Sequence, residues 1–262
     1  MSLRPRVVLL GHGISYSASP AMHSAAFRSA HLDWSYELRD VPPEGLAAAV
    51  AELRGAASRG ANVTIPHKVA VMPLLDGLDD KAEAAGAVNT ITRVGDRLIG
   101  SNTDVEGVRT ALAEVGLEPA GARVVVLGAG GSAKAAAVAL KGARLTFVTR
   151  RRAAAAGLPG EVIGWDDPGW RALVGGADLL LNATPLGRQE ELPLPATQLP
   201  RDGAVIDLVY TSEGTPLVRA ARERGLRCVD GWTVLLAQGA AAFEAWTGRP
   251  APLAAMRAAL VR

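Results

Sequence analysis

The sequence predicts an α/β protein of two domains, each built around a mainly parallel sheet. Apolar runs of strand length alternate with alanine-rich stretches of helix length along nearly the whole chain, which is the pattern of parallel strands joined by helices. The alternation restarts after the turn-rich stretch Leu117-Glu-Pro-Ala-Gly121. A chain of 262 residues can form one large domain or two modest ones, either with a sizeable core.

In the first half, strands and helices are predicted in alternation. A helix is expected to begin at Pro20 with Ser19 as its N-cap, because a hydroxyl there accepts a backbone N–H and proline fits the first turn. The third strand should end before Pro66, which has no N–H for a ladder, and a hairpin should close on Gly95 and Asp96. The predicted strands are Arg6–Leu10, Trp34–Leu38, Ala61–Thr64, Ala87–Arg93 and Arg97–Gly100, and the predicted helices are Pro20–Ala30, Pro43–Arg54 and Thr103–Val115.

In the second half, the alternation continues into a helical tail. The predicted strands are Arg123–Leu127, Arg144–Val148, Leu179–Leu181, Val205–Leu208 and Leu226–Val229, and the predicted helices are Ser132–Leu140, Pro216–Arg224, Thr233–Trp246 and Leu253–Val261. The last two helices form a tail that the residue pattern by itself assigns to neither half.

Composition and charge restrict the partners and the compartment. Lys and Arg number 28 against 26 Asp and Glu, so neither nucleic acid nor a membrane surface is expected as a partner. No apolar run approaches the ~20 residues of a membrane helix and no signal peptide is visible, so we expect a cytoplasmic protein. The one cysteine, Cys228, excludes an internal disulfide. The histidines show no metal-ligand spacing, so no metal is expected.

A glycine-rich turn in the second half predicts a dinucleotide site. The strand Arg123–Leu127 runs directly into Gly128-Ala-Gly130-Gly131-Ser-Ala133, which opens a helix. Glycines let the backbone approach a pyrophosphate, and the helix N-terminus offers N–H groups and the positive end of its dipole. Alanine replaces the third glycine of the usual spacing, where the requirement is close helix–strand packing. Any tight turn between strand and helix could use such glycines, so the motif needs support from the next strand.

The end of the next strand favours NADP over NAD. It reads Phe147-Val-Thr149-Arg150-Arg151-Arg152, about twenty residues past the glycines. An NAD enzyme usually carries Asp or Glu there for the ribose 2′-hydroxyl, whereas a guanidinium binds a 2′-phosphate through paired hydrogen bonds. Arg150 is the first candidate for the phosphate and Arg151 the second. The alternative is a solvated basic helix start, which the helix dipole disfavours.

Four polar clusters in or beside the first half are the candidates for a substrate site. Each alone has an ordinary structural interpretation. Ser19 and Asp104 could cap helices. Asn89 could belong to a turn, and Lys68 could be a surface lysine. The clusters are Ser17-Ala-Ser19-Pro20-Ala-Met-His23, Asn62-Val-Thr64-Ile-Pro-His-Lys68, Gly86-Ala-Val-Asn89-Thr90 and Ser101-Asn-Thr-Asp104.

Together, the clusters resemble the shikimate dehydrogenase family. Its hallmarks are Ser-x-Ser-Pro-x-x-His, Asn-x-Thr-x-Pro-x-Lys, Gly-Ala-x-Asn-Thr and Asn-Thr-Asp, and this chain carries them in that order. The second half continues the resemblance with Asn182-Ala-Thr184-Pro-x-Gly187, Asp207-Leu-Val-Tyr210 and Gln238-Gly-Ala-Ala-Ala-Phe243-Glu-x-Trp246. The resemblance therefore covers essentially the whole chain.

The resemblance implies a fold and a reaction. A substrate-binding domain of residues 1–104 and 238–262, to which the C-terminal helices return, would accompany a Rossmann-like NADP-binding domain of residues 105–237. The reaction would be the reversible NADPH-dependent reduction of 3-dehydroshikimate to shikimate in aromatic amino acid biosynthesis, carried out in the cleft between the domains. Lys68 would be the catalytic acid/base and Asp104 its partner, since a ketone reduced by hydride leaves an alkoxide that needs a proton.

The resemblance also implies the binding residues. Ser17 and Ser19 would hold the substrate carboxylate, and Tyr210 would line the cleft. The residues implied for the rest of the substrate are Thr64, Lys68, Asn89, Asp104 and Gln238. The residues implied for NADP are Gly128, Ala129, Gly130, Gly131, Ser132, Ala133, Thr149, Arg150, Arg151, Asn182, Thr184, Leu208 and Gly231. The assembly state, a monomer or a homodimer, is left open.

Some positions depart from the family pattern. Gly13 stands where proline is usual, Tyr16 where histidine is usual and Ser212 where proline is usual. None of these changes removes a catalytic residue, but they leave open a paralogue that acts on quinate or has relaxed cofactor use. A non-catalytic NADP-binding module is the other alternative, and the retention of both Lys68 and Asp104 disfavours it.

Overall fold

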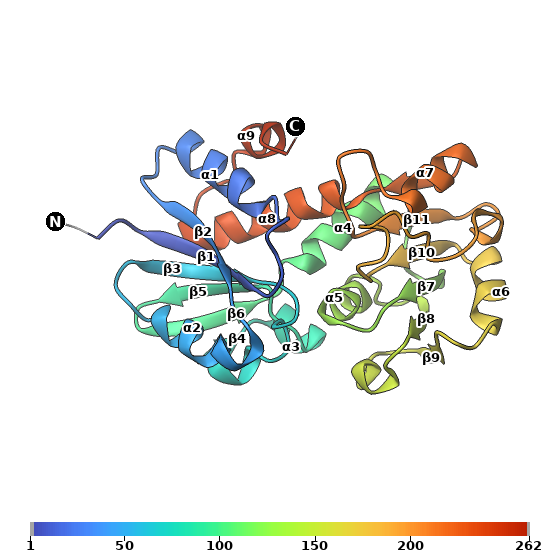
Figure 1. Ribbon diagram of the computed structural model, residues 1–262, viewed down its shortest axis with the longest axis horizontal. Coiled ribbons are helices and arrows are strands. Elements are labelled where there is room, and N and C mark those ends of the chain that lie inside the picture. Colours follow the sequence, from blue (N-terminus) through green and yellow to red (C-terminus); the bar gives the residue numbers. More distant parts are fainter. Residues whose placement is uncertain (1–2, 261–262) are drawn as a thin grey trace. The chain divides into compact units, whose positions relative to one another are not determined.

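The computed structural model of the protein describes residues 3–260, and these residues form two compact units (Figure 1). Unit 1 consists of the described chain up to Val105 together with the residues from Leu235 onward, and unit 2 consists of Glu106–Val234. Each unit contains one six-stranded sheet with helices, so the predicted α/β fold class is confirmed. Within residues 3–260, no helix is both long enough and apolar enough to cross a bilayer.

Unit 1 is built around a mixed sheet. Its strands are β1 (Arg6–Gly11), β2 (Ser35–Asp40), β3 (Ser58–Val63), β4 (Gly77–Leu78), β5 (Thr90–Val94) and β6 (Arg97–Ser101). Its helices are α1 (Ser19–Ser29), α2 (Leu46–Glu52), α3 (Asp80–Ala85) and α9 (Leu253–Ala258), with short 3₁₀ helices at Pro43–Gly45 and Met72–Leu74. Two further helices, α4 (Asp104–Glu114) and α8 (Gly231–Thr247), contribute residues to both units.

The strand order of unit 1 is β2-β1-β3-β5-β6-β4. Strand β1 pairs in parallel with β2 and β3, whereas β5 pairs antiparallel with both β3 and β6. The pair β5–β6 is the predicted hairpin. The parallel pairing places the carboxyl ends of β1 and β3 at one edge of the sheet, so the loops that follow these two strands start side by side.

Three predicted helices of unit 1 differ in detail from the structure, and a further helix was not predicted. Helix α1 begins at Ser19 itself with Ala18 at the N-cap, so the prediction that Ser19 caps the helix is wrong. The predicted helix Pro43–Arg54 is a 3₁₀ turn followed by α2. Helix α3 was missed because only two small residues of its six are buried, which leaves no apolar stripe to detect. Of the last predicted helix, Leu253–Val261, the structure has Leu253–Ala258, and Val261 lies outside the described residues.

Unit 2 has an all-parallel sheet with helices in the connections. Its strands are β7 (Arg123–Leu127), β8 (Arg144–Thr149), β9 (Glu161–Gly164), β10 (Leu179–Asn182), β11 (Ala204–Asp207) and β12 (Arg227–Val229). Its helices are α5 (Gly131–Ala139), α6 (Gly169–Gly175) and α7 (Pro216–Glu223), with short 3₁₀ helices at Arg152–Ala155 and Ala196–Gln198. The strand order is β12-β11-β10-β7-β8-β9, which is the doubly wound order of a dinucleotide-binding sheet.

Strand β9 and helix α6 were not predicted. Strand β9 is a four-residue edge strand with one fully buried position, so it lacks the apolar run that marks a central strand. Helix α6 begins and ends in glycine, and glycine is a poor helix former. In both segments tertiary packing decided the conformation, with Trp170 of α6 fully buried in the core of unit 2.

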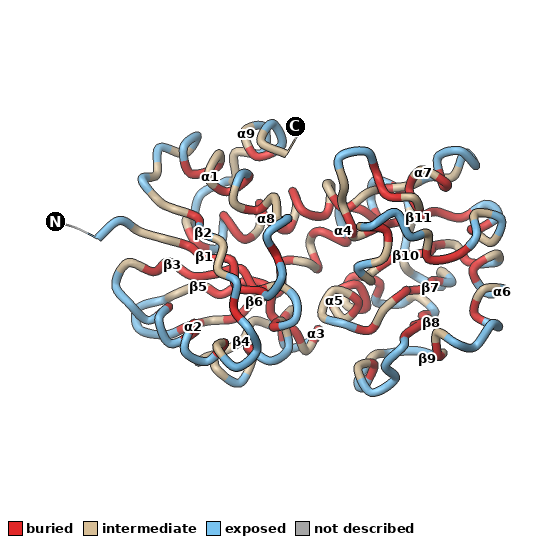
Figure 2. Tube along the Cα trace, viewed as in Figure 1, coloured by how far each residue is buried: buried red, intermediate tan, exposed pale blue. Residues whose placement is uncertain are grey.

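Each unit has its own apolar core, seen as the buried segments in Figure 2. In unit 1, the C-terminal helix α8 packs on α1, with the rings of Phe27 and Phe243 5.8 Å apart. Farther along α8, the indole of Trp246 donates a hydrogen bond to the Ile91 carbonyl of β5 at 3.0 Å. These contacts hold α8 in unit 1, where Gln238 lies beside Asn89, the residue that precedes β5.

Candidate active site and cofactor site

Of the predicted carboxylate-binding serines, Ser17 lies on the loop between β1 and α1, and Ser19 is the first residue of α1. Ser19 is buried, and its backbone N–H donates to Ser17 Oγ at 3.3 Å. The loop is anchored at its start, where Asp40 Oδ1 accepts the Gly13 N–H at 3.1 Å and lies 2.8 Å from His12 Nδ1. The Ser17 hydroxyl therefore lies beside the first N–H group of a helix, and helix N-termini favour bound carboxylates.

Lys68 follows β3 on a segment whose backbone is tied on several sides. The Thr64 N–H donates to the Leu10 carbonyl of β1 at 2.9 Å. His67 is buried with Nε2 2.7 Å from the Val41 carbonyl, and the Lys68 carbonyl accepts the Val88 N–H at 2.7 Å. The long side chain of Lys68 therefore starts from a fixed backbone position.

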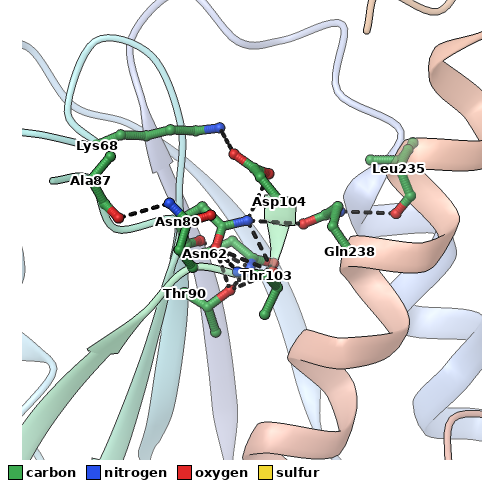
Figure 3. A network of polar contacts seen from close by, with 10 residues as sticks. Asn62, Lys68, Ala87, Asn89, Thr90, Thr103, Asp104, Leu235 and Gln238 are labelled. Carbon is green, nitrogen blue, oxygen red and sulfur yellow. Dashed lines mark hydrogen bonds and ion pairs between the residues drawn. The ribbon is translucent and has the colours of Figure 1, made fainter. Parts of the chain in front are cut away.

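The ammonium group of Lys68 pairs with Asp104, the first residue of α4 (Figure 3). Lys68 Nζ lies 2.5 Å from Asp104 Oδ2, and the two side chains are only 11% and 14% exposed. Removing either charge would leave the other largely buried without its counter-ion, which is costly in a protein interior. The pair is therefore held as a unit.

Asn89 lies beside this pair, and a backbone group settles the orientation of its amide. The Thr103 N–H can only donate, and it lies 2.7 Å from Asn89 Oδ1, so Nδ2 points toward Asp104 and donates to Oδ1 at 2.8 Å. Asp104 thus accepts from an ammonium on one oxygen and from an amide on the other. Gln238 of α8 extends the network, with its Oε1 3.4 Å from Asn89 Nδ2 and its Nε2 donating to Leu235 O at 2.9 Å.

Unit 1 thus brings four of the predicted substrate residues into one polar network. Lys68, Asn89, Asp104 and Gln238 come from four separate segments of the chain and are joined by the contacts drawn in Figure 3. Of the three others from this unit, Ser17 and Thr64 lie on the loops that follow β1 and β3, and Ser19 is the first residue of α1. The eighth, Tyr210, belongs to unit 2.

Asn89 is supported by a chain of hydrogen bonds to which the sequence assigned no role. The buried Tyr36 hydroxyl donates to Asn62 Oδ1 at 2.7 Å. Asn62 Nδ2 donates in turn to the Asn89 carbonyl at 3.2 Å and to Thr90 Oγ1 at 3.1 Å. The sequence did carry a signal, since Asn62 is an amide within a buried strand and such a group needs hydrogen-bond partners.

This network suits proton transfer to a small polyhydroxylated acid. Lys68 is the one ammonium donor of the cluster and Asp104 its acceptor, a combination that can deliver a proton to an alkoxide. Carboxamides such as those of Asn89 and Gln238 can both donate and accept, which is the chemistry that binds hydroxyl groups. In this structure, the two amides contact each other, Asp104 and Leu235 O.

In unit 2, the glycine turn lies where the strand order reverses, between β7 and β10. Ligands of doubly wound sheets bind at the carboxyl ends of these strands. Gly128 follows β7 with φ +107°, and a Cβ there would lie 3.0 Å from Ala183 O just beyond β10. A Cβ on Gly130, the N-cap of α5, would meet no atom within 4 Å in the described part of the chain. The turn therefore has an open side at a helix N-terminus, which fits a pyrophosphate.

The predicted phosphate-binding arginines follow β8, the strand next to β7. Thr149 ends β8 and is buried, and its Oγ1 accepts the Arg151 N–H at 3.1 Å. Arg150, Arg151 and Arg152 are all exposed, and a guanidinium nitrogen of Arg152 lies 3.3 Å from the position of a Cβ on Gly164 of β9. The end of β8 therefore carries exposed guanidinium groups of the kind that binds a 2′-phosphate.

The carboxyl ends of β10 and β11 carry a second polar cluster, centred on Asp207. Asn182 and Asp207 end these strands, face each other in register and are fully buried. Asn182 Oδ1 accepts from both the N–H and the hydroxyl of Thr184, at 3.1 and 2.6 Å. Leu208, which follows Asp207, donates its N–H to the Asn182 carbonyl at 3.0 Å. The predicted cofactor residues Asn182, Thr184 and Leu208 thus form one contiguous group.

Tyr210 follows this cluster along the chain, and Gly231 contacts the segment that carries it. The ring of Tyr210 lies 4.5 Å from that of Trp232, and the Trp232 indole donates to Thr211 O at 3.0 Å. The Gly231 N–H donates to Val209 O at 3.2 Å. The start of α8 therefore holds the segment that carries Tyr210.

Asp207 should make stability depend on pH in a direction opposite to that of most carboxylates. Burial raises the pKa of Asp207 to about 6 despite hydrogen bonds from Thr215, Val209 and Asn182. Folded protein therefore binds a proton between about pH 4 and 6 that unfolded protein does not, so this contribution to stability grows as pH falls through that window. Asp207→Asn abolishes the titration. From about pH 7.5 to about pH 5, the unfolding free energy of wild type should gain about 1 kcal/mol relative to the variant.

Urea denaturation of both proteins at both pH values measures this difference. An unchanged gap between wild type and variant would contradict the predicted titration of Asp207, whatever the shared pH dependence of the other carboxylates.

In sequence, the chain matches two domain families that both belong to one kind of enzyme. Residues 9–91 match the family described as Shikimate dehydrogenase substrate binding domain, and residues 231–261 match Shikimate 5′-dehydrogenase C-terminal domain. A protein of Moorella thermoacetica named Shikimate dehydrogenase (NADP(+)) is 47% identical over 266 residues, which cover 95% of this chain and 90% of the relative.

Two solved structures are similar over nearly the whole chain. The Thermus thermophilus shikimate 5-dehydrogenase in complex with NADP(H) and shikimate has a TM-score of 0.84 and 37% identity, covering 97% of this chain and 98% of that one. The Listeria monocytogenes shikimate 5-dehydrogenase in complex with shikimate and NAD has a TM-score of 0.84 and 30% identity, covering 99% and 97%. The two structures hold the same acid with different nicotinamide cofactors.

Proposed function

The chain belongs to the shikimate dehydrogenase family, and on that basis we propose that it catalyses the reversible NADPH-dependent reduction of 3-dehydroshikimate to shikimate, a step of aromatic amino acid biosynthesis. The observation that carries this proposal is the shielded contact between Lys68 Nζ and Asp104 Oδ2 at 2.5 Å. It supplies a proton donor beside a set of groups suited to a polyol.

In this proposal Lys68 acts as acid and base. When bound, NADPH supplies the hydride that reduces the 3-keto carbon, and the developing alkoxide takes a proton from Lys68 Nζ. Asp104 holds the ammonium in place through Oδ2. In the reverse direction the neutral amine removes the hydroxyl proton, and Asp104 stabilises the ammonium that results.

The substrate is held by hydroxyl and amide groups of the candidate site. Ser17 and Ser19 bind its carboxylate at the N-terminus of α1, and the adjacent groups of Asn89 and Gln238 bind its ring hydroxyls. Thr64, Tyr210 and the Lys68–Asp104 pair complete the proposed set. We assign residues 1–104 and 238–262 to the substrate-binding domain and residues 105–237 to the NADP-binding domain.

The proposed NADP site follows the strand order of unit 2. The backbone of the glycine turn binds the pyrophosphate, and the carboxyl ends of β10 and β11 bind the nicotinamide half. The residues assigned to the site are Gly128, Ala129, Gly130, Gly131, Ser132, Ala133, Thr149, Arg150, Arg151, Asn182, Thr184, Leu208 and Gly231. The open side of the turn at Gly130 supports this assignment.

The proposal is tested by steady-state formation of NADPH from shikimate, with quinate and NAD as alternative reactants. We expect kcat/KM to be greatest for shikimate with NADP. A paralogue with relaxed cofactor use is the second candidate, since the Listeria neighbour binds NAD, and comparable kcat/KM values with NAD and NADP would establish it. Absence of turnover with any of these acids, despite NADP binding, would overturn the catalytic assignment.

Replacing Arg150 with alanine should weaken the use of NADP selectively. A charged hydrogen bond to the 2′-phosphate contributes about 1.5–3 kcal/mol, so Arg150→Ala should raise KM for NADP about 10- to 100-fold. The KM for NAD, which lacks this phosphate, should stay within about twofold. Arg144→Ala is the matched control, because Arg144 is an exposed arginine at the opposite end of the same strand. An equal rise of KM for both cofactors would refute the assignment of Arg150 to the phosphate.

We also propose a cytoplasmic location and an assembly no larger than a homodimer. Cell fractionation and light scattering after size-exclusion chromatography would check the two statements.

A further inference from the structure

Asp207 is a buried carboxylate to which the reaction assigns no role. It is 0% exposed at the carboxyl end of β11. Its two oxygens accept hydrogen bonds from three groups, the Asn182 amide at 2.9 Å, the Val209 N–H at 3.0 Å and the Thr215 hydroxyl at 2.6 Å. These three donors are uncharged, so the carboxylate is retained at a desolvation cost. The hydrogen bonds that Asp207 accepts indicate what this buried carboxylate does.

The three donors belong to three different segments. Asn182 starts the loop that runs to Gly187, and the same amide group also donates to Leu186 O at 3.0 Å. Val209 lies between Leu208 and Tyr210 on the segment after β11. Thr215 is the N-cap of α7 and accepts the Val218 N–H. One carboxylate therefore ties together the loop after β10, the segment after β11 and the start of α7.

The loop after β10 and the segment after β11 both pack closely, the first against Asp207 and Thr215 and the second against the start of α8. A Cβ on Gly187 would lie 3.4 Å from Thr215 Cβ and 3.7 Å from Asp207 Oδ2. A Cβ on Gly231 would lie 2.6 Å from Leu208 O, so the segment after β11 lies directly on the backbone at the start of α8. A shift of Asp207 would therefore move both loops.

The topology of unit 2 assigns these loops to one half of the cofactor. Arg150 and Arg151 follow β8, on one side of the switch point, and the glycine turn follows β7 at the switch point itself. A dinucleotide bound with its 2′-phosphate at β8 and its pyrophosphate at β7 continues over the ends of β10 and β11. The loops tied by Asp207 therefore lie at the nicotinamide half.

We propose that Asp207 is a positioning residue that sets the loops after β10 and β11 for the nicotinamide half of NADP, without itself contacting the adenosine half. This inference rests on the proposed function, since it takes NADP as the ligand. A residue that only stabilises unit 2 would, when replaced, weaken binding of both halves of the cofactor alike. A positioning role for Asp207 predicts weaker binding of the nicotinamide half alone.

Binding of two ligands to the full chain tests the proposal. Isothermal titration calorimetry at about pH 7.5 would measure Kd for NADP and for adenosine 2′,5′-bisphosphate, which is the adenosine half alone. Asp207→Ala should raise Kd for NADP about tenfold, the effect of about one hydrogen bond, and leave Kd for the bisphosphate within about twofold. Asp207→Asn, which keeps the shape and one acceptor, should restore Kd for NADP to within about threefold of wild type.

Asp178→Ala is the matched control. Asp178 precedes β10 at the opposite, amino end of the sheet, where it accepts the Arg123 N–H at 2.8 Å. Its loss should leave Kd for both ligands unchanged. If Asp207→Ala does not fold, Thr215→Val carries the test, because it keeps the carboxylate and removes the donor to Oδ2, together with the N-cap acceptor of the Val218 N–H. It should raise Kd for NADP about threefold with no change for the bisphosphate.

Different results would contradict the positioning role of Asp207 and the proposed function. Equal weakening of both ligands by the Asp207 variants, or an unchanged Kd for NADP, would overturn the positioning role. A wild-type protein that binds neither NADP nor the bisphosphate would instead refute the proposed function.

Discussion

Lys68→Ala is expected to lower kcat for shikimate oxidation about 10³-fold, because a positioned general acid and base contributes about 10²- to 10⁴-fold. The structure offers no substitute amine within the polar network of Lys68, Asn89, Asp104 and Gln238. NADP binding, assigned to unit 2, should be unchanged. Steady-state assays give kcat, and calorimetry gives Kd for NADP on the same samples.

Two comparisons make this result specific. Lys141→Ala removes an exposed lysine from unit 2 and should leave kcat unchanged. Lys68→Met keeps most of the side-chain volume and should lose as much activity as the alanine variant, because the chemistry depends on the amine. Retention of kcat within about threefold in either Lys68 variant would remove it from the catalytic role.

Asp104→Asn is expected to lower kcat about 10²-fold although it barely changes the shape of the side chain. Both oxygens of Asp104 face donors, Lys68 Nζ at 2.5 Å and Asn89 Nδ2 at 2.8 Å. Asparagine has one oxygen, so its own NH₂ must face one of these donors. The largely buried ammonium also loses its counter-ion, and Lys68 is no longer held where it can transfer the proton.

A double-mutant comparison shows whether the two residues act together. The Lys68→Met, Asp104→Asn protein should be little slower than Lys68→Met alone, because the aspartate acts through the lysine. Asp80→Asn, an exposed aspartate in the same unit, is the control and should retain wild-type kcat. Multiplicative losses in the double variant would mean that Asp104 acts independently of Lys68.

Local patterns in the sequence were sufficient for most elements of the fold. The apolar runs at β7, β8 and β11 and the glycine turn before α5 were predicted because their side chains and backbone requirements are visible along the chain. Strand β9 and helix α6 were missed, since one is a short edge strand and the other is bounded by glycines. Their conformation comes from neighbours such as β8, with which β9 pairs.

For the candidate site, the sequence identified Lys68, Asn89, Asp104 and Gln238 through ordered motifs. It placed Asn62 and Thr90 in motifs without a role, and it did not single out Tyr36. These three residues support Asn89. It also assigned no positioning role to Asp207. These residues act through partners that are distant in sequence. Tyr36 and Asn62 meet because β2 and β3 both pair with β1.

The sequence by itself determined which chemical groups this protein has, namely Lys68, Asp104 and Asp207 within recognisable motifs, a glycine turn and arginines in place of an acidic residue. Only the tertiary structure decided how those groups are oriented: that Asn89 turns its amide nitrogen toward Asp104, and that Asp207 accepts from three separate segments. The physical reason is that a residue type states what a side chain can donate or accept, whereas strand pairing and helix packing choose the partner that it meets.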